Sequence, residues 1–514
     1  MYSFLGGLVI LILGYFIYGA IVDKIFAPDD RRTPCVEHPD GVDYVPITPG
    51  RAFLIQLLNI AGLGPIFGAL SGAIWGPQVY LWIVFGTILA GAVHDYLVGM
   101  LSVRNDGASV SEITGKYLGG FVLQIMRLFS VILLVMVGVV FMVGPAQLLA
   151  RMLVQGTSAV SGASTAATEF WGYSVADWTK ILTVIILVYY FLATLLPIDK
   201  LIAKVYPLFG LCLIFMALGV GGVTVYNHIQ FTQGVAGAKP MIELWEGLYN
   251  MHPNAANMPI WPLMFITVAC GAISGFHATQ SPLMARCLTS ERQGRFVFYG
   301  AMVAEGIIAL IWASAGIAFY NTGIGGDLTK FTTEALAKIG GGANSVYEIS
   351  IGLLGPIGSI LALLGVVACP ITSGDTAFRS ARLTIADWFK IDQKGFAPRL
   401  VLALPLLAAG YAISYVNYNV VWRYFSWSNQ TLAMIALWAG AVYLCRNVGS
   451  AKGFLAAIPA TFMSAVSVTY FCIAPECYLM LERNRAYGIG IGVAILFFAI
   501  YFVRVYSPAT KKAY

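Results

Sequence analysis

Residues 51–75 read RAFLIQLLNIAGLGPIFGALSGAIW, an apolar stretch interrupted by three glycines and a proline between positions 62 and 68. A second apolar stretch, residues 260–288, is interrupted at ISGFHATQSP (273–282). Backbone inside a bilayer normally forms continuous helix, and unwound backbone is tolerated only where protein buries it or it lines a cavity. A matched pair of such breaks therefore predicts the substrate site of a secondary transporter.

The composition is that of a membrane protein. Of the 514 residues, 59% are hydrophobic and 11% are charged, whereas soluble domains carry about 25% charged residues. The first apolar segment lacks the basic start and cleavage site of a signal peptide, so we expect it to be retained. Because a span needs about 20 apolar residues, the sequence predicts thirteen: 2–24, 52–75, 78–102, 119–144, 179–197, 205–226, 260–287, 295–321, 349–377, 398–418, 425–446, 452–473 and 485–505.

The charge distribution predicts the orientation in the membrane. With the N-terminus outside, 21 of the 30 Lys and Arg residues fall in inner loops and 8 on the outer side. Inner loops carry the excess of basic residues in membrane proteins. The sequence therefore predicts an outer N-terminus and an inner C-terminus, and the net charge of +6 reflects topology rather than nucleic-acid binding.

Ten of the predicted spans form two blocks, 52–226 and 260–446, and each block opens on a broken span. Five spans per block force the two blocks into opposite orientations, which predicts an inverted five-plus-five repeat. One extra helix (1–24) precedes the repeat and about two (452–505) follow it. The whole chain, 1–514, is then a single all-α polytopic transmembrane domain.

Each break is expected to start a half-helix. Ser281-Pro282 has the order of an N-cap hydroxyl followed by proline at the first helical position, and Gly64-Pro65 is similar with glycine as the cap. Two helix N-termini at the membrane midplane carry partial positive charge that suits a carboxylate. The alternative is that the glycines permit close helix packing and the prolines only bend the helices.

Several ionisable side chains lie inside predicted spans. A charge at membrane depth costs roughly 2.5–3.5 kcal/mol on insertion scales, so such residues persist where they face water, a partner or a proton path. For Asp95 and Asp375 two interpretations stay open: a role in ion coupling, or pairing with Arg104 and Arg379 near the inner face. The preferred functional candidate is His277, because it lies in the break and histidine titrates near neutral pH. The set comprises His94, Asp95, His277, Glu305 and Asp375.

Hydroxyl and amide side chains give weaker signals. Thr372 and Ser373 follow Pro370, which frees a backbone carbonyl, and these oxygens together suit Na⁺. The alternative is that both hydroxyls bond to their own helix. Four amides either line a polar cavity or join helices, namely Gln56, Asn59, Asn429 and Gln430.

The loops and cysteines leave further questions open. Residues 145–155 and 328–339 are predicted to form short surface helices, and residues 240–250 an ordered connector or a gate. Cys472 and Cys477 form either a disulfide or two separate thiols. The other cysteines lack metal-ligand spacing, so neither a metal site nor a cofactor is predicted.

The chain resembles the carbon-starvation (CstA-type) transporter family at four stretches. These are 64–119 (beginning GPIFGALSGAIWG), 271–312 (beginning GAISGFHATQSPLMAR), 370–394 (PITSGDTAFRSARLTIADWFKIDQK) and 427–438 (WSNQTLAMIALW). The resemblance implies an importer of small carboxylated nutrients (pyruvate, peptides or amino acids) in a bacterial or archaeal cytoplasmic membrane. It also implies membership of the amino acid–polyamine–organocation superfamily and a leucine-transporter-type fold. We expect transport by such a protein to be coupled to H⁺ or Na⁺ symport.

The resemblance also implies where the sites lie. The superfamily's cation site implies the backbone near Ala61–Gly62 together with Thr372 and Ser373, and the buried charges add His94, Asp95 and Asp375 as coupling candidates. The substrate site carried over residue by residue comprises Gly62, Gly64, Ser274, Gly275, His277, Thr279 and Gln280.

Three other function classes compete with the symporter. A metal-dependent membrane enzyme could use His94, Asp95 and His277 as ligands, although no HExxH pair exists. A nutrient sensor would normally carry a signalling domain, and a channel would not require two inverted breaks. The expected partners are a small carboxylate and membrane lipid, without nucleic acid. The oligomeric state stays open.

Overall fold

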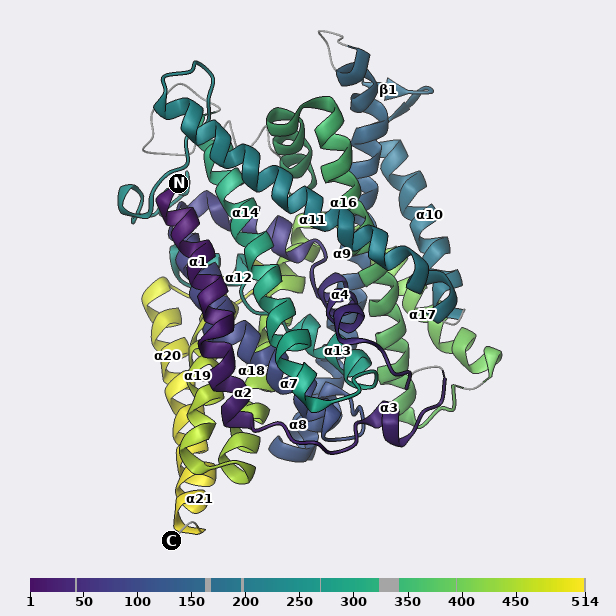
Figure 1. Cartoon of the computed structure of the whole chain (residues 1–514), viewed down its shortest axis with the longest axis vertical. Coiled ribbons are helices and arrows are strands. Elements are labelled where there is room, and N and C mark those ends of the chain that lie inside the picture. The colour runs from purple at the N-terminus through teal and green to yellow at the C-terminus, as the bar shows by residue number, and fades with distance from the viewer. Residues whose placement is uncertain are drawn as a thin grey trace.

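The computed structural model describes residues 1–41, 44–161, 168–195, 198–268, 270–322, 342–393 and 395–512. Its helices run mostly along the long axis, with the N-terminus toward one end and the C-terminus at the other (Figure 1). Within these ranges the strands are β1 (Glu169–Phe170) and β2 (Tyr173–Ser174), an antiparallel two-residue pair. The predicted all-α membrane architecture is confirmed apart from this small hairpin.

The first half of the chain contains one broken and several continuous spans. It begins with α1 (Tyr2–Phe16), α2 (Tyr18–Phe26) and the short α3 (Pro34–Glu37). The first broken span is α4 (Pro49–Ile60) followed by η1 (Gly64–Gly68), α5 (Ala69–Gly72) and η2 (Ala73–Trp75). The next span combines α6 (Val79–Leu81), η3 (Trp82–Gly91) and α7 (Ala92–Val103), and it is followed by α8 (Val110–Leu118), α9 (Gly120–Ser161), α10 (Val175–Leu195) and α11 (Ile198–Thr232).

The second half opens on the other broken span, after the single turn η4 (Leu244–Glu246). This span is α12 (Ile260–Thr267) and α13 (Gly275–Ala285), followed by η5 (Glu291–Gln293), η6 (Arg295–Tyr299) and α14 (Gly300–Thr322). The remaining helices are α16 (Gly342–Phe389), α17 (Phe396–Ile413), α18 (Tyr418–Asn447), α19 (Phe454–Ile473), α20 (Arg483–Tyr501) and α21 (Ser507–Lys512), with the short η7 (Ser450–Gly453), η8 (Pro475–Cys477) and η9 (Phe502–Tyr506) between them.

Length and apolarity identify most of the expected spans. Nine described helices are long and apolar enough to cross a bilayer, or ten if the bent pair Pro49–Ile60 and Gly64–Trp75 counts as one span. The predicted spans 260–287, 349–377 and 425–446 are helical as α12–α13, α16 and α18, but they fall outside that set. They carry many of the polar residues described below, which makes them less apolar than a lipid-facing helix.

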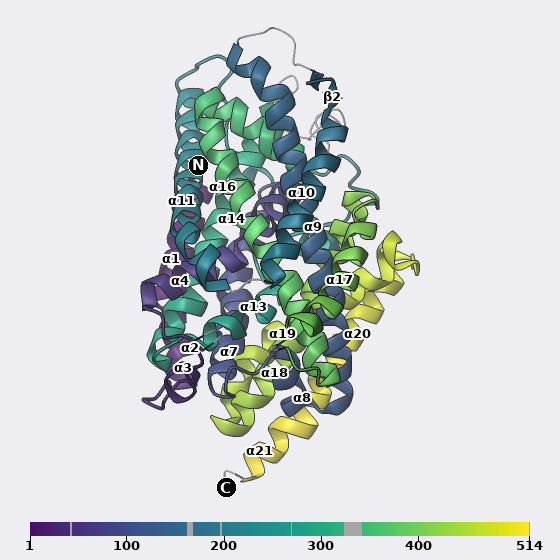
Figure 2. The same cartoon turned by 90° about the vertical axis from the view of Figure 1, so that its right-hand side faces the viewer.

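The broken spans are buried, whereas several other apolar helices, such as α20, expose much of their surface. α9 and α16 pack together so closely that a Cβ on Gly138 would overlap the Phe378 ring. Figure 2 shows α9, α16 and α14 in the middle of the bundle, with α17 and α20 toward one side. Large apolar side chains on α20, such as Ile491 and Ile495, are exposed. An exposed apolar face of this kind is expected where a helix meets lipid.

One expectation about the connections is corrected, and one open alternative is decided. Residues 145–155 do not form a separate surface helix, because α9 continues through Pro145 to Ser161. Cys472 and Cys477 are free thiols. The predicted helix at 328–339 lies outside the described residues. The connector 240–250 contains only the η4 turn, and Glu243 accepts hydrogen bonds from the backbone and hydroxyl of Ser3 at the start of α1.

At the C-terminal end of the molecule, polar contacts join the two halves. The guanidinium of Arg104 donates to both carboxylate oxygens of Glu291 at 2.9 Å and to the Tyr443 hydroxyl at 2.7 Å. The Ile47 N–H donates to the Cys287 carbonyl, which links the approach to α4 with the end of α13. Arg104 therefore pairs with Glu291, so its predicted alternative pairing with Asp95 is wrong.

Candidate functional site

The first break lies where the sequence places it. α4 ends at Ile60, Ala61 leaves the helical region (φ −80°, ψ 52°), and the helix resumes at Gly64 with Pro65 in its first turn. The two parts differ in direction by 53°. Gly64-Pro65 therefore starts a half-helix as predicted, although the cap position is Leu63 instead of a glycine.

Glycine is required at this break by the neighbouring segments. A Cβ on Gly64 would overlap the side chain of Cys270, and one on Gly62 would lie 2.6 Å from the Phe141 ring. Unstrained atoms do not approach each other so closely. The two breaks consequently touch each other directly, and close packing explains both glycines in the present conformation.

The second break begins earlier than predicted. α12 ends at Thr267, and α13 starts at Gly275 with the extended Ser274 at its N-cap position. The predicted start at Ser281-Pro282 is wrong: Ser281 lies inside α13, where its hydroxyl donates to the His277 carbonyl. A proline inside a helix removes one backbone hydrogen bond without ending the helix when surrounding packing holds it.

The N-terminus of α13 is closed by a side chain from α18. Oδ1 of Asn429 accepts the Phe276 N–H at 2.6 Å and the Ser274 hydroxyl at 3.1 Å. Its Nδ2 group donates to the Cys270 sulfur at 3.3 Å. The amide oxygen of Asn429 therefore satisfies the Phe276 backbone N–H at this helix end and ties α13 to α18.

Replacing Asn429 with alanine is expected to destabilise this break. The buried Phe276 N–H loses its acceptor, which costs roughly 1–3 kcal/mol. The melting temperature of the purified protein should fall relative to Asn257→Ala, a matched change at an exposed surface amide. Equal melting temperatures for the two variants would show that Asn429 does not hold α13.

Four ionisable side chains from α7, α13 and α14 meet in the interior. Nδ1 of His277 lies 2.8 Å from Oδ2 of Asp95, and Nδ1 of His94 lies 2.8 Å from Oδ1 of the same carboxylate. Nε2 of His277 lies 3.2 Å from Oε2 of Glu305 on α14. All four side chains are fully buried. We call the set His94, Asp95, His277 and Glu305 the histidine–carboxylate chain.

This chain carries unused hydrogen-bonding capacity. Among the described residues, Nε2 of His94 has no hydrogen-bond partner, and the Glu305 oxygens make no well-aligned hydrogen bond despite their contact with His277. A buried polar atom left unpaired costs roughly 1–3 kcal/mol. The arrangement thus retains free positions on both sides of the Asp95–His277 pair, where a proton can be gained or passed on.

Other predicted substrate residues lie along α13. Thr279 donates its hydroxyl to the Phe276 carbonyl and also borders a small cavity of about 50 Å³ that continues to Arg286 and Asp387. The buried Gln280 donates to the Thr279 hydroxyl, and its carbonyl oxygen has no partner among the described residues. Gln56 of α4 donates to the Ser281 hydroxyl at 3.3 Å, which ties the two broken spans together.

The predicted cation residues on α16 do not join this chain. The Ser373 hydroxyl lies 3.0 Å from both the Leu58 and Cys369 carbonyls, so it bridges α16 to the end of α4. Thr372 donates to the Cys369 carbonyl of its own helix. Asp375 is buried and accepts the Tyr189 hydroxyl of α10 at 3.0 Å. In these bonds each of the three residues has partners outside the histidine–carboxylate chain.

Sequence relationships agree with this architecture. The sequence model of the family described as "Carbon starvation protein CstA" matches residues 1–168, 143–320 and 332–470. The chain belongs to this family. The protein named Peptide transporter CstA of Bacillus subtilis is 28% identical over 98% of this chain and 95% of its own length. Pyruvate/proton symporter BtsT of Escherichia coli is 30% identical over 57% of this chain and 45% of that protein.

Solved transporter structures share the fold of this CstA-family chain. A mutant manganese transporter of Eremococcus coleocola superposes with a TM-score of 0.53 over 92% of this chain and 99% of that chain, at 14% identity. MhsT in complex with L-phenylalanine gives a TM-score of 0.53 over 87% and 97%, also at 14% identity. Both are leucine-transporter-type folds. These structures show the fold alone, whereas the relatives named as transporters and the apolar helices indicate that the chain is a multi-pass membrane transporter.

Sequence reasoning undervalues two residues of the site. Glu305 is one of the buried charges but not one of the predicted coupling residues, and Asn429 is one of four equivalent amides. Glu305 has a usable signal, since it is a carboxylate in the apolar run AMVAEGIIALIW. Nothing local in WSNQT distinguishes the role of Asn429 from that of Gln430, which donates to the Phe265 carbonyl.

Proposed function

We propose that the protein is a proton symporter that imports a small carboxylated nutrient. The observation that carries this proposal is the buried histidine–carboxylate chain, because it starts in the second broken span and reaches two neighbouring spans through His277. A substrate bound at the breaks can change the geometry of His277 directly. Family members named as a peptide transporter and as a pyruvate/proton symporter support the same class of function.

Charge counting explains why such a chain binds protons. With Asp95 and Glu305 ionised and His277 protonated, one negative charge remains in a fully buried site. An uncompensated buried charge is strongly unfavourable, so one further proton neutralises the group. The site can thus alternate between two protonation states as it alternately faces the two sides of the membrane.

Sodium is the less favoured coupling ion. The resemblance-based cation site combines Thr372 and Ser373 with the backbone near Ala61–Gly62, but the two hydroxyls donate instead to the carbonyls of Cys369 and Leu58. Of the two, the Ser373 hydroxyl links α16 to α4 directly, whereas Thr372 bonds only within α16. We therefore assign Ser373 a structural role in joining these helices.

Replacing Ser373 with alanine tests this assignment. The variant loses one buried hydrogen bond, worth about 1 kcal/mol, and uptake should remain as sodium-independent as in the parent protein. Thr372→Ala, which removes only bonds within α16, is the matched control. Sodium-stimulated uptake in the parent that disappears in Ser373→Ala would instead establish a sodium site.

The substrate is expected to bind at the two half-helix N-termini. The starts of η1 and α13 present backbone N–H groups, and partial positive charge at helix N-termini favours a carboxylate. Displacement of the Asn429 oxygen from the Phe276 N–H would open one such position. Pyruvate, amino acids and peptides all carry the required group, and they form the substrate class that we propose.

The topology that we propose is the inverted repeat of 52–226 and 260–446, with the N-terminus outside and the C-terminus inside a bacterial or archaeal cytoplasmic membrane. The opposite placement of the two termini in Figure 1 supports it. Helix packing around the central breaks supports alternating access by rocking of one repeat against the other.

The structure supports a metal-dependent membrane enzyme less than it supports a symporter. His94, Asp95 and His277 do come together, but each imidazole Nδ1 lies at hydrogen-bond distance from a different Asp95 oxygen. Among the described ranges no three His, Cys, Asp or Glu side chains are grouped as metal ligands. A nutrient sensor remains a different proposal, since it requires substrate binding without net transport.

Proton movement can be measured directly. In proteoliposomes containing a trapped pH indicator, external pyruvate, alanine or dialanine should acidify the lumen only when the protein is present. Lumen acidification by at least one of the three supports proton symport. Labelled substrate that enters without acidification would contradict it.

A further inference from the structure

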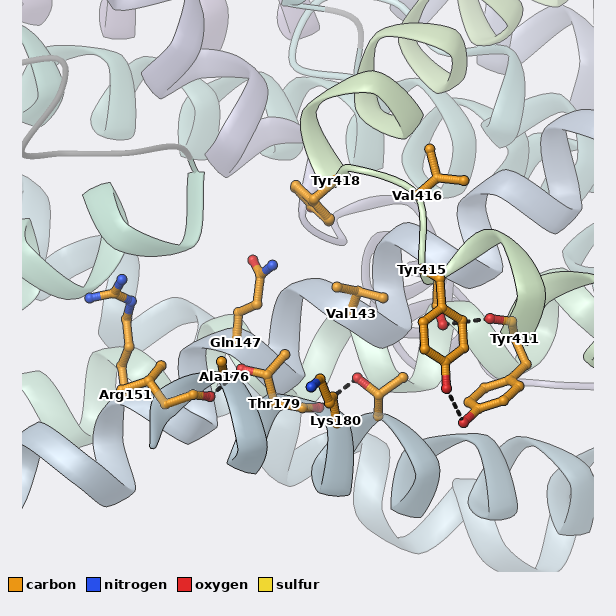
Figure 3. A pocket seen from close by; sticks show the side chains of 13 residues that line it. Val143, Gln147, Arg151, Ala176, Thr179, Lys180, Tyr411, Tyr415, Val416 and Tyr418 are labelled. Atoms are coloured by element: carbon orange, nitrogen blue, oxygen red, sulfur yellow. Dashed lines mark hydrogen bonds between the residues drawn. The ribbon is translucent and has the colours of Figure 1, made fainter. Parts of the chain in front are cut away.

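A second cavity lies away from the histidine–carboxylate chain. It has a volume of about 620 Å³ and is lined by α9, α10 and the turn from α17 to α18. Figure 3 shows Gln147 and Arg151 on α9, Lys180 on α10, and Tyr415 and Tyr418 at the turn. α9 and α17 end on this side, and α10 and α18 begin on it. In the proposed topology this is the outer side of the membrane.

The lining of this cavity is electropositive. Arg151 and Lys180 are its charged residues among those described, and no carboxylate lines it. The two neighbouring acids lie outside the lining and offset part of this charge: Asp177, which accepts the N–H and hydroxyl of Ser174, interacts with Lys180, and Glu348 on α16 interacts with Arg151. A cavity lined by one sign of charge concentrates ions of the opposite sign.

An aromatic layer separates this cavity from the first break. The Tyr418 ring, which lines the cavity, lies 6.5 Å from the ring of Phe67 in η1 and stacks on Trp422 at 6.2 Å. A Cβ on Gly144 would lie 3.2 Å from the Tyr418 hydroxyl and would overlap Leu63 at the break. The cavity and the break are thus only one layer of side chains apart.

The Tyr418 hydroxyl is a buried polar group that packing of the ring alone does not require. It is buried and has no hydrogen-bond partner among the described residues. Leaving such a hydroxyl unpaired costs roughly 1–3 kcal/mol, which a ligand or a rearranged neighbour can recover. It lies on the path from the cations of the cavity to the α4–η1 break.

We propose that this cavity is an outer collecting site for the carboxylate group of the substrate. Arg151 and Lys180 attract the anion, and rotation of the Tyr418 layer then admits it to the break. The inference rests on the carboxylate transport proposed above, but the charge of the cavity can be measured without any transport. Lipid phosphate is the other anion that such a site could hold.

The experiment uses Thr179→Cys, a small change in the cavity lining on α10, in reconstituted full-length protein. Its reaction rates with an anionic (sulfonatoethyl) and a cationic (trimethylammonioethyl) methanethiosulfonate reagent report the local potential, with the parent protein giving the background of its native cysteines. We expect the anionic reagent to react about tenfold faster than the cationic one after correction for their rates with free thiol. Adding Arg151→Gln and Lys180→Gln should abolish that preference.

Protection distinguishes the possible anions. Pyruvate, alanine or dialanine should slow the labelling of Thr179→Cys, and vesicles of purely zwitterionic lipid should give the same result as vesicles with anionic lipid. Equal rates for both reagents would overturn the electropositive cavity. A preference that only anionic lipid suppresses would overturn the substrate assignment and show a lipid site. Both readouts remain valid if uptake assays fail, so the two proposals can fail separately.

Discussion

Replacing Asp95 with asparagine is expected to abolish proton-driven uptake. The carboxylate bonds both His94 and His277, and asparagine has nearly the same shape but cannot carry the charge that holds the His277 proton. Removing one partner of a buried ion pair costs about 3–5 kcal/mol, which corresponds to at least about a hundredfold loss in rate if transport requires the pair. The initial rate of labelled pyruvate, alanine or dialanine uptake in proteoliposomes measures the effect.

Asp106→Asn provides the control for that experiment. Asp106 lies in the turn after α7, and its positive φ of 52° is tolerated by asparagine. This variant should transport like the parent protein. An Asp95→Asn protein that is folded, elutes as the parent does and still accumulates substrate would exclude the histidine–carboxylate chain from coupling.

Replacing Glu305 with glutamine is expected to separate exchange from accumulation. The amide keeps the size of the side chain but is neutral in every conformation, so the chain loses the group that accepts its extra proton. Substrate can still bind at the breaks and drive alternation, whereas the proton gradient no longer adds energy. The accumulation ratio should fall to about one, the equilibrium value, because a carrier without differential proton binding cannot respond to the gradient.

Counterflow is the measurement that isolates this effect. Vesicles loaded with unlabelled substrate should still take up labelled substrate through Glu305→Gln, at a rate comparable to that of the parent protein. Asp95→Asn should show neither activity if the Asp95–His277 pair is needed for the conformational change itself. Gradient-driven accumulation by Glu305→Gln would refute the assigned role of Glu305.

The positions of the breaks can be predicted from the sequence because the residues that interrupt a helix lie at the break itself. The glycines and Pro65 near the first break cannot continue a helix in lipid without compensation, and their matched position in the second half adds weight. Composition similarly predicts most spans, since lipid imposes the same apolar requirement on each. The repeat boundaries stay a prediction, supported by the shared fold of the solved transporters.

The failures concern contacts between distant segments. Ser281-Pro282 has all the local features of a helix start, yet Asn429, about 150 positions later, caps the helix at Gly275 instead. Pro145 suggests a helix end, but α9 continues through it, packed against the rest of the bundle. Asp95 has two local interpretations, and only the fold shows that His277 and not Arg104 is its partner.

The glycines also show why the site cannot be tested by replacing a glycine with a larger residue that fills it. A larger residue at Gly64 would collide with Cys270, and one at Gly275 with the Asn429 backbone carbonyl. Loss of uptake in such variants would follow from misfolding as readily as from a blocked site. Isosteric changes in the buried charges add no atoms that would collide with a neighbour, which is why Asp95 and Glu305 carry the main predictions.

The most direct test of the account is substrate accumulation in proteoliposomes under an imposed proton gradient and, separately, an imposed sodium gradient. Labelled pyruvate, alanine and dialanine are each supplied outside. Proton symport predicts that at least one of them accumulates above equilibrium under the inward proton gradient and that the sodium gradient has no effect. Accumulation driven by sodium alone, or no gradient-dependent uptake of any of the three, would contradict it.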